Sequence, residues 1–201
     1  MITIVDYGMG NLRSVQKAIE KVGGRAEVTC DPDRVRRAGR VILPGVGAFA
    51  DAIAELHRTG LGEAFVEVVR AGRPCMGVCL GLQLLFDVSE EDGEHRGLGL
   101  IPGRVVRFDP AGGLKVPHMG WNTLRITRPA PILAGIEPEP SVYFVHSYHG
   151  RAADPGHVAA EADYPDPFPA IVWRDNLLAC QFHPEKSQAV GLAMYANFAA
   201  M

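Results

Sequence analysis

The chain has 201 residues, of which 47% are hydrophobic and 21% are charged, and its formal net charge is −3 at neutral pH. This length suits one domain of ordinary size with a substantial buried core. The small negative charge gives no electrostatic reason to expect binding to nucleic acid or to an anionic membrane surface. No stretch approaches the roughly 18 consecutive apolar residues of a membrane-spanning helix.

The N-terminal sequence and the cysteine content favour a cytoplasmic location. The chain begins M-I-T-I-V-D, without a basic region, and reaches Asp6 and Gly8 before any long apolar run, which argues against a signal peptide. Four cysteines in a chain of this length, with no secretion signal, are typical of reduced thiols. We therefore expect a cytoplasmic protein in which thiol chemistry is available.

The first half of the chain alternates short apolar runs with helical patterns. Strands are expected over residues 2–6, 26–30, 41–43 and 75–78, and helices over residues 11–22, 50–56, 61–69 and 80–88. Asn11 can cap the first helix, and Gly23 and Gly24 stop it. Such alternation predicts βαβ units and a parallel sheet that is buried on both faces.

The second half carries strand-like segments that are separated by turns rich in proline and glycine. These segments span residues 103–108, 122–126, 142–145, 157–162, 170–173 and 177–182, and a helix over residues 188–200 closes the chain. Several have the pattern of antiparallel strands added to the first sheet. The expected fold is therefore α/β, a three-layer, doubly wound, mostly parallel sheet with antiparallel additions. No repeat or linker interrupts it, so residues 1–201 are expected to form a single domain.

Three glycine-rich loops are candidate binding sites. In open α/β sheets, ligands bind beyond the carboxyl ends of the strands, which selects residues 7–11, 44–48 and 77–81. The first two loops match neither G-x-G-x-x-G nor G-x-x-x-x-G-K-[ST]. A nucleotide-binding module is therefore disfavoured.

The third loop reads G-V-C-L-G, which is the nucleophile elbow G-x-S-x-G with sulfur in place of oxygen. In such a turn Cys79 would occupy a strained backbone region between small neighbours. The helix that follows would offer free N–H groups and a partial positive end, which favour a thiolate. The backbone N–H of Leu80 is placed to help bind an oxyanion. The same pattern also fits a small buried residue that only packs.

A thiolate nucleophile needs a base, and Q-F-H-P-E-K-S at residues 181–187 supplies one. Pro184 stiffens the turn between His183 and Glu185. A carboxylate beside the imidazole would select its tautomer and stabilise the imidazolium. Alternatively, Glu185 is a first-turn acid of the last helix and His183 only packs. If Cys79 and His183 lie at the ends of neighbouring strands, a Cys-His-Glu triad results.

The other cysteines and histidines predict no metal site. Cys75 and Cys79 form P-C-x-x-x-C, which is one residue too long for the zinc-deaminase signature, and H-x-E follows them instead of preceding them. His146 is a plausible ligand contact, His149 suits a hydrogen-bonded structural role, and His118 has no catalytic partner in the sequence. No metal ion or other cofactor is expected.

Together these motifs resemble the class I glutamine amidotransferases. G-V-C-L-G-L-Q and Q-F-H-P-E are patterns of the whole class. D-Y-G-M-G-N, P-G-V-G-A-F, P-H-M-G-W-N and Y-F-V-H-S-Y are similar to motifs of the glutaminase subunits that serve histidine biosynthesis. The resemblance extends from the first strand to the last helix. Leu82, His149 and Cys180 depart from the usual residues, but none of these departures removes a required group.

The resemblance implies that Cys79 attacks the carboxamide of glutamine, which gives a glutamyl thioester and releases ammonia. His183 would act as base and then as acid, and Glu185 would orient it. Gly47 and Leu80 would form the oxyanion hole. Four residues would hold the α-amino and carboxylate groups of glutamine: Gln83, Glu91, Ser147 and Tyr148.

The resemblance also implies a partner, a (β/α)8-barrel cyclase that uses the ammonia to make imidazole glycerol phosphate and an aminoimidazole carboxamide ribotide. Asn11, Trp121, Tyr143 and Lys186 match positions that face this partner. Two alternatives stay open. A stand-alone cysteine hydrolase or peptidase would turn over its substrate without a partner. A catalytically silent interaction subunit would not need the Cys-His-Glu set.

Overall fold

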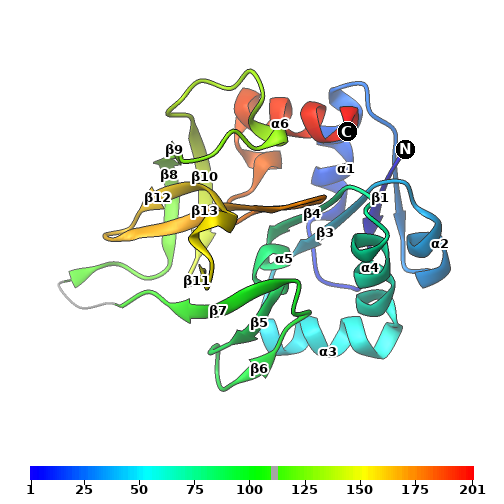
Figure 1. Ribbon diagram of the computed structural model, residues 1–201, viewed down its shortest axis with the longest axis horizontal. Helices are drawn as coiled ribbons and strands as arrows, with labels where there is room; N and C mark the ends of the chain where they lie inside the picture. The colour runs from blue at the N-terminus through cyan, green and yellow to red at the C-terminus, as the bar shows by residue number, and fades with distance from the viewer. Residues whose placement is uncertain (110–112) are drawn as a thin grey trace.

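The computed structural model describes residues 1–109 and 113–201, and its centre is an eight-stranded sheet in the order β2-β1-β3-β4-β14-β13-β12-β9 (Figure 1). Five neighbouring strands run in parallel: β1 (Ile2–Val5), β2 (Ala26–Thr29), β3 (Val41–Gly45), β4 (Cys75–Cys79) and β14 (Leu177–Cys180). Four of the five, all except β2, are buried along their whole length. Short apolar runs without a polar face suit strands that are covered on both sides.

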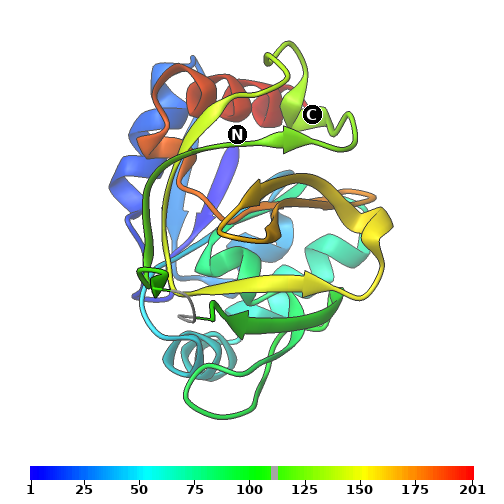
Figure 2. The same ribbon diagram turned by 90° about the vertical axis from the view of Figure 1, so that its left-hand side faces the viewer.

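Helices cover both faces of this sheet. They are α1 (Leu12–Lys21), α2 (Pro32–Arg37), α3 (Phe49–Thr59), α4 (Leu61–Arg70), α5 (Leu80–Gln83) and α6 (Gln188–Ala200). Because side chains alternate along a strand, Ile42 packs in the cluster that contains α1 and α6, whereas Val41 and Leu43 pack in the cluster that contains α3 and α4. Figures 1 and 2 show these two helical layers on opposite sides of the sheet. The predicted three-layer α/β fold is confirmed.

The strands from β5 (Phe86–Ser89) onward divide among three sheets. β13 (Pro167–Arg174), β12 (Val158–Asp163) and β9 (Arg125–Ile126) extend the central sheet with antiparallel pairing, as predicted. The other strands form two further sheets. One has the order β11-β7-β5-β6 and contains β11 (Tyr148–Ala152), β7 (Ile101–Arg107), β5 (Phe86–Ser89) and β6 (His95–Arg96). The other is the ribbon of β10 (Ser141–His146) and β8 (His118–Thr123). The described part of the chain also contains the 3-10 turns η2 (Pro131–Leu133), η3 (Pro155–His157) and η4 (Pro184–Lys186).

The helix expected over residues 80–88 is wrong, because α5 ends at Gln83 and β5 begins at Phe86. The carbonyls of Leu84 and Leu85 accept hydrogen bonds from the backbone N–H groups of residues 98 and 100, not from the next turn of a continuing helix. Leu84, Leu85 and Phe86 are all fully buried. A run that is buried on every side has no polar face, so its periodicity cannot separate a helix from a strand.

Two smaller expectations also change. The strand predicted over residues 122–126 is broken: β8 ends in the ribbon and β9 belongs to the central sheet. Asn11 occupies the N-cap position of α1, but its side chain makes no capping hydrogen bond. Asp31 caps α2 by accepting hydrogen bonds from the backbone N–H groups of Asp33 and Arg34.

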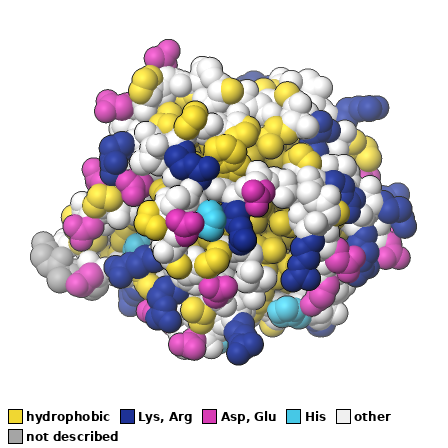
Figure 3. Space-filling view, viewed as in Figure 1, with side chains coloured by type: hydrophobic (Ala, Val, Ile, Leu, Met, Phe, Trp, Pro, Cys, Tyr) yellow, Lys and Arg dark blue, Asp and Glu magenta, His cyan; other side chains and the backbone are white. Residues whose placement is uncertain are grey.

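The surface carries charges of both signs. On the face shown in Figure 3, Lys and Arg side chains are interspersed with Asp and Glu and form no single basic area. Across the described part of the chain, no helix combines the length and the apolar character that crossing a membrane requires.

Candidate active site

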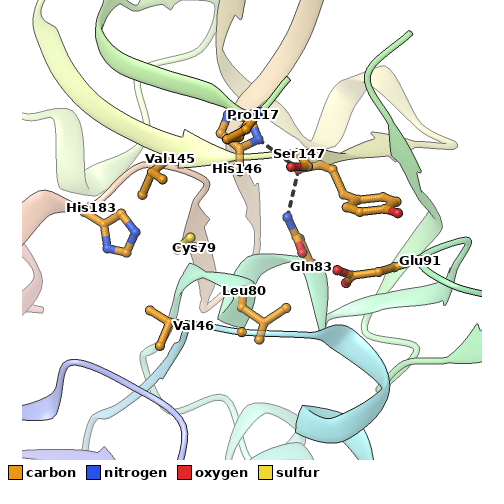
Figure 4. Close-up of a pocket in the computed structure, with 12 residues that line it drawn as sticks. Val46, Cys79, Leu80, Gln83, Glu91, Pro117, Val145, His146, Ser147 and His183 are labelled. Atoms are coloured by element: carbon orange, nitrogen blue, oxygen red, sulfur yellow. Dashed lines mark hydrogen bonds between the residues drawn. The ribbon is translucent and has the colours of Figure 1, made fainter. Parts of the chain in front are cut away.

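A cavity of about 360 Å³ lies beyond the carboxyl ends of β3 and β4 (Figure 4). The three predicted glycine-rich loops contribute unequally: Val46 and Gly47 of the second loop and Cys79 and Leu80 of the third line the cavity, whereas residues 7–11 do not. The structure brings eight of the predicted site residues to this cavity: Gly47, Cys79, Leu80, Gln83, Glu91, Ser147, Tyr148 and His183. Glu185 does not line it and lies behind His183.

Cys79 occupies the turn between β4 and α5 in a strained conformation. Its backbone has φ 55° and ψ −110°, a region that residues other than glycine rarely adopt. The residue is only 7% exposed, and its sulfur faces the cavity (Figure 4). The strained turn predicted from G-V-C-L-G is therefore present. The helix that follows has only four residues, so the expected contribution of a helix dipole to the thiolate loses its basis.

The glycines that flank Cys79 allow backbone segments to touch. The positive φ belongs to Cys79 itself, not to Gly77 or Gly81. A Cβ on Gly81 would lie 1.9 Å from the carbonyl oxygen of Leu43, and a Cβ on Gly77 would lie 2.7 Å from the carbonyl oxygen of Gly81. Glycine is required here because β3, β4 and α5 pack backbone against backbone.

His183 follows β14, the strand that pairs in parallel with β4, so its ring reaches the sulfur of Cys79 from the adjacent strand end (Figure 4). Its Nδ1 lies 2.8 Å from Oε1 of Glu185, and both side chains are almost completely buried. Tyr195 of α6 donates its hydroxyl to the other carboxylate oxygen at 3.4 Å. The hydroxyl of Ser187 donates to the carbonyl of His183 at 2.7 Å and fixes the backbone of the turn.

The protonation of His183 depends on its two neighbours. Burial lowers the pKa of His183. Its hydrogen bonds and charge interactions with Cys79 and Glu185 raise the pKa by more than burial lowers it, so that the pKa of His183 is about 10. An imidazolium is therefore favoured beside the sulfur at neutral pH. A Cys–His pair in this state holds its proton on the ring, where it can be given to a leaving group.

Glu91 connects the cavity to the start of α3. Its Oε2 accepts a hydrogen bond from the backbone N–H of Phe49, the first residue of that helix, at 2.9 Å. Burial raises the pKa of Glu91, although this hydrogen bond opposes the effect. One carboxylate oxygen is thus fixed by the helix terminus, while the residue still lines the cavity.

Tyr7 supports the loop that carries Gly47 and explains the D-Y-G motif. Its hydroxyl donates to the carbonyl of Pro44 at 2.9 Å, and a Cβ on Gly45 would lie 2.5 Å from that hydroxyl oxygen. Burial raises the pKa of Tyr7, so it stays a neutral donor. Gly47 has φ 103°, which only glycine adopts readily.

A hydrogen-bonded chain runs from the cavity wall to the β8–β10 ribbon. The carbonyl of Tyr148 accepts from Nε2 of Gln83 and is 2.8 Å from Nδ1 of His146 (Figure 4). Nε2 of His146 is 3.0 Å from Nδ1 of His118, and Nε2 of His118 is 3.3 Å from Nδ2 of Asn122. His118 and His146 face each other in the ribbon register.

His118 and His146, the two histidines in this series of hydrogen bonds, are neutral. A carbonyl only accepts, so His146 carries its proton on Nδ1 and accepts on Nε2, and His118 must then donate from its Nδ1. Burial lowers the pKa of His118 to about 4. Burial, together with the neighbouring histidines, lowers the pKa of His146 to about 3.

The neutral histidines predict acid sensitivity of the fold. Between pH 6.5, an ordinary histidine pKa, and pH 4, the unfolded chain binds protons at His118 and His146 that the folded chain excludes. The free energy of unfolding therefore falls as the pH falls through this window, by about 1.4 kcal/mol per pH unit for each histidine. We expect His118→Gln to reduce this slope in urea titrations at pH 6.5 and pH 5.

Above about pH 8 neither histidine binds a proton to a significant extent in the folded or the unfolded chain, so this window serves as the internal control. There, His118→Gln and the unsubstituted chain should differ in stability by a constant amount. Equal slopes for the two chains between pH 6.5 and pH 5 would contradict the assignment of a neutral His118.

Three of the four predicted partner-facing residues lie together. The rings of Trp121 and Tyr143 have centroids 6.1 Å apart, and Nζ of Lys186 lies 5.7 Å from the centroid of Tyr143. Trp121 is 50% exposed and its neighbour on the same strand, Met119, is 61% exposed. Asn11 is exposed at the start of α1 and is not part of this group.

Sequence reasoning missed Gln181 as well as Tyr7. Nε2 of Gln181 lies 3.9 Å from Sγ of Cys79. A signal was available, because Gln181 precedes His183 by two residues and side chains two apart lie on one face of an extended segment. Cys75 and Cys180 are buried, and His149, for which a hydrogen-bonded structural role was expected, is buried with Nδ1 3.2 Å from the carbonyl oxygen of Gly150. Within residues 1–109 and 113–201, no three His, Cys, Asp or Glu side chains are arranged to hold a metal ion.

Comparison with known families matches residues 3–200 of the chain to the family described as glutamine amidotransferase class-I. Two similar curated proteins are both named imidazole glycerol phosphate synthase subunit HisH. The protein from Syntrophotalea carbinolica is 57% identical, and the match covers 100% of both chains. The protein from Geobacter sulfurreducens is 52% identical over 100% of this chain and 98% of its own length.

Solved structures share the fold at low sequence identity. A structure described as glutamine amidotransferase has a TM-score of 0.77 and 20% identity, and the match covers 100% of both chains. The structure of PurLQS from Thermotoga maritima has a TM-score of 0.76 and 18% identity over 98% of this chain and 94% of that one. Because these matches cover nearly the whole chain, the similarity includes the whole architecture.

Proposed function

Because the chain belongs to the glutamine amidotransferase class-I family, and within it to the HisH subunits of imidazole glycerol phosphate synthase, we propose that it is the glutaminase of such a synthase. It hydrolyses glutamine to glutamate and delivers the ammonia to a cyclase subunit, which makes imidazole glycerol phosphate and aminoimidazole carboxamide ribotide. The observation that carries this proposal is the strained Cys79, which faces a buried His183 held by Glu185 at 2.8 Å.

In the first half of the reaction, Sγ of Cys79 attacks the carboxamide carbon of glutamine. The developing oxyanion is bound by the backbone N–H groups of Leu80 and Gly47, which both line the cavity. The imidazolium of His183 then gives its proton to the departing nitrogen, so that ammonia leaves and a glutamyl thioester remains. Glu185 keeps the ring in the orientation that this transfer needs.

In the second half, water attacks the thioester carbonyl. His183, now neutral, takes a proton from this water and keeps it, and the sulfur leaves as a thiolate when the tetrahedral intermediate collapses to glutamate. The sum is glutamine plus water giving glutamate plus ammonia, and Cys79 and His183 recover their starting states. No cofactor takes part in these steps.

The α-ammonium and α-carboxylate groups of the substrate glutamine are held by the cavity wall that contains Gln83, Glu91, Ser147 and Tyr148. Both N–H groups of the Gln83 amide already have acceptors, the carbonyl of Tyr148 at 2.8 Å and Oε1 of Gln181 at 3.2 Å. Only its Oε1 is left for the substrate, so Gln83 binds the α-ammonium together with Glu91. The Ser147 and Tyr148 segment then receives the carboxylate.

The partner is a (β/α)8-barrel cyclase that docks on the β8–β10 ribbon. Trp121, Tyr143 and Lys186 form a compact group there, and Asn11 extends the contact along the start of α1. Two large exposed apolar side chains, Met119 and Trp121, are the kind that become hot spots when a partner covers them. Residues 1–201 act as one amidotransferase domain in this complex. The four cysteines are free, which suits a reducing compartment and supports a cytoplasmic location for the protein.

The experiment that tests this function is glutamine hydrolysis by the chain alone and with its cyclase. We expect slow turnover alone and an acceleration of about 10²-fold or more once cyclase and its nucleotide ligand are present, because the partner completes the site. Trp121→Ala should require about tenfold more cyclase for the same acceleration, since a truncated central aromatic typically costs 1–2 kcal/mol of binding.

The matched control is Arg58→Ala, at an exposed position of α3, which should respond to cyclase like the unsubstituted chain. Fast hydrolysis of glutamine or of peptides without any partner would favour the stand-alone hydrolase instead. Failure of cyclase to change the rate would reject the coupled glutaminase.

A further inference from the structure

Gln181 connects the nucleophile to the wall of the cavity. Its Nε2 lies 3.9 Å from Sγ of Cys79, and its Oε1 lies 3.2 Å from Nε2 of Gln83. The residue is fully buried, and its backbone N–H donates to the carbonyl of Ala170 on β13 at 2.9 Å. The steps described above for Cys79, His183 and Glu185 leave this amide without a role.

The orientation of the Gln181 amide follows from its neighbours. The carbonyl of Tyr148 only accepts hydrogen bonds, so the amide of Gln83 must turn its NH₂ group toward it. The second hydrogen of that NH₂ group then points at Gln181, which must present its oxygen there. The NH₂ group of Gln181 is consequently directed at the sulfur of Cys79, and a flipped amide would place two donors face to face.

We propose that Gln181 is a positioning residue for the nucleophile, which donates a hydrogen bond to Sγ of Cys79 and is itself held in that orientation by Gln83. The proposal rests on the proposed function only in taking Cys79 as the reacting group. Two side chains thus interact with the sulfur: His183 is the base, and Gln181 is a fixed donor that does not titrate.

The chemical effect of this donor is to favour the thiolate over the thiol. An N–H group stabilises a negatively charged sulfur more than a neutral one, because hydrogen bonds to charged acceptors are the stronger kind. The contact also restricts the rotation of the Cys79 side chain, so the sulfur stays aimed at the cavity. Gln83 influences the sulfur only through Gln181, since its own amide hydrogens are both used elsewhere.

The test measures the reactivity of each cysteine with iodoacetamide in the full-length chain, with the labelled peptides quantified by mass spectrometry. Cys30 is exposed and provides an internal reference rate, whereas Cys75 and Cys180 are buried and report on the integrity of the core. We expect Gln181→Met, which keeps the length of the side chain and removes the amide, to slow alkylation of Cys79 by about five- to tenfold. The rate at Cys30 should not change.

A double substitution tests whether Gln83 affects the sulfur of Cys79 through Gln181 or independently of it. Gln83→Met should slow alkylation of Cys79 by about two- to fivefold in the otherwise unchanged chain, because Gln181 loses the contact that orients it. Adding Gln83→Met to Gln181→Met should produce no further loss. The matched control is Gln16→Met on α1, which also removes an amide bonded to a backbone carbonyl and should leave Cys79 unaffected.

In the complex with cyclase, Gln181→Met should lower kcat for glutamine while KM stays within about twofold, since the residue acts on the sulfur and not on the bound substrate. If Gln181→Met exposes Cys75 or Cys180, the same measurements are made on Gln181→Leu, which also removes the donor and adds no charge.

An unchanged Cys79 rate in the variant that keeps its core, or losses that multiply in the double variant, would overturn the proposal. Alkylation needs no glutamine, so its outcome is separate from whether glutamine is the substrate. That question is decided by turnover of the unsubstituted complex.

Discussion

Replacing Cys79 by alanine should abolish glutamine-dependent synthesis by the complex with the cyclase and leave ammonia-dependent synthesis intact. Removal of a catalytic nucleophile typically costs about 10⁴- to 10⁶-fold in turnover. The cyclase reaction itself needs only ammonia, which can be supplied from solution. The measurement compares product formation by the same complex with glutamine and with an ammonium salt.

Two outcomes would contradict this expectation in different ways. Retained use of glutamine by Cys79→Ala would show that another group is the nucleophile. Loss of the ammonia-dependent reaction would show that the substitution disturbs the complex as a whole. Cys75→Ala is the matched control, because this thiol is buried at the other end of the same strand and burial raises its pKa to about 12, which makes it a poor nucleophile.

Replacing Gly81 by alanine should prevent stable folding. The added Cβ would lie 1.9 Å from the carbonyl oxygen of Leu43, which is backbone of a central strand and cannot rotate away. Separating β3 from α5 by the required distance disturbs a region where every side chain is buried. We expect a loss of about 4 kcal/mol or more in the free energy of unfolding, which is a large share of the stability of a domain this size.

Gly39→Ala is the matched control for Gly81→Ala. Its φ is not positive, and a Cβ there would meet nothing within 4 Å. A glycine replaced at such a position changes stability by about 1 kcal/mol or less, often upward, because the unfolded chain becomes less flexible. Urea titration of both variants gives the comparison, and a Gly81→Ala chain as stable as Gly39→Ala would contradict the backbone contact.

The sequence was most informative where local patterns carry the information. Alternating apolar runs and glycine stops predicted the parallel strands, and G-V-C-L-G predicted the strained turn at Cys79. The meeting of Cys79 and His183 was expected only on the condition that they lie at the ends of neighbouring strands, because parallel strands end at one edge of a sheet. The parallel pairing of β4 with β14, which brings together residues 104 positions apart, comes from the structure.

The parts that escaped prediction depend on pairing between distant segments. The helix expected at residues 80–88 ends early because Leu84 and Leu85 bond to residues 98 and 100, a contact that no local pattern records. His118 and His146 meet only because β8 and β10 pair in one register. The role of Gln181 depends on which way one amide points, and that is settled by Tyr148 from another strand.

The backbone packing around Cys79 also determines which positions around the cavity can accept substitutions. Side chains at positions 77 and 81 are excluded by neighbouring main chain, so the turn that presents the sulfur offers no room for variation. The opposite wall of the cavity comes from Val145, Ser147 and Tyr148, at the junction of β10 and β11, where side chains point into free volume. A search for variants that accept amides other than glutamine therefore has its useful positions in the second half of the chain. Libraries built on the nucleophile turn would mostly yield unfolded protein.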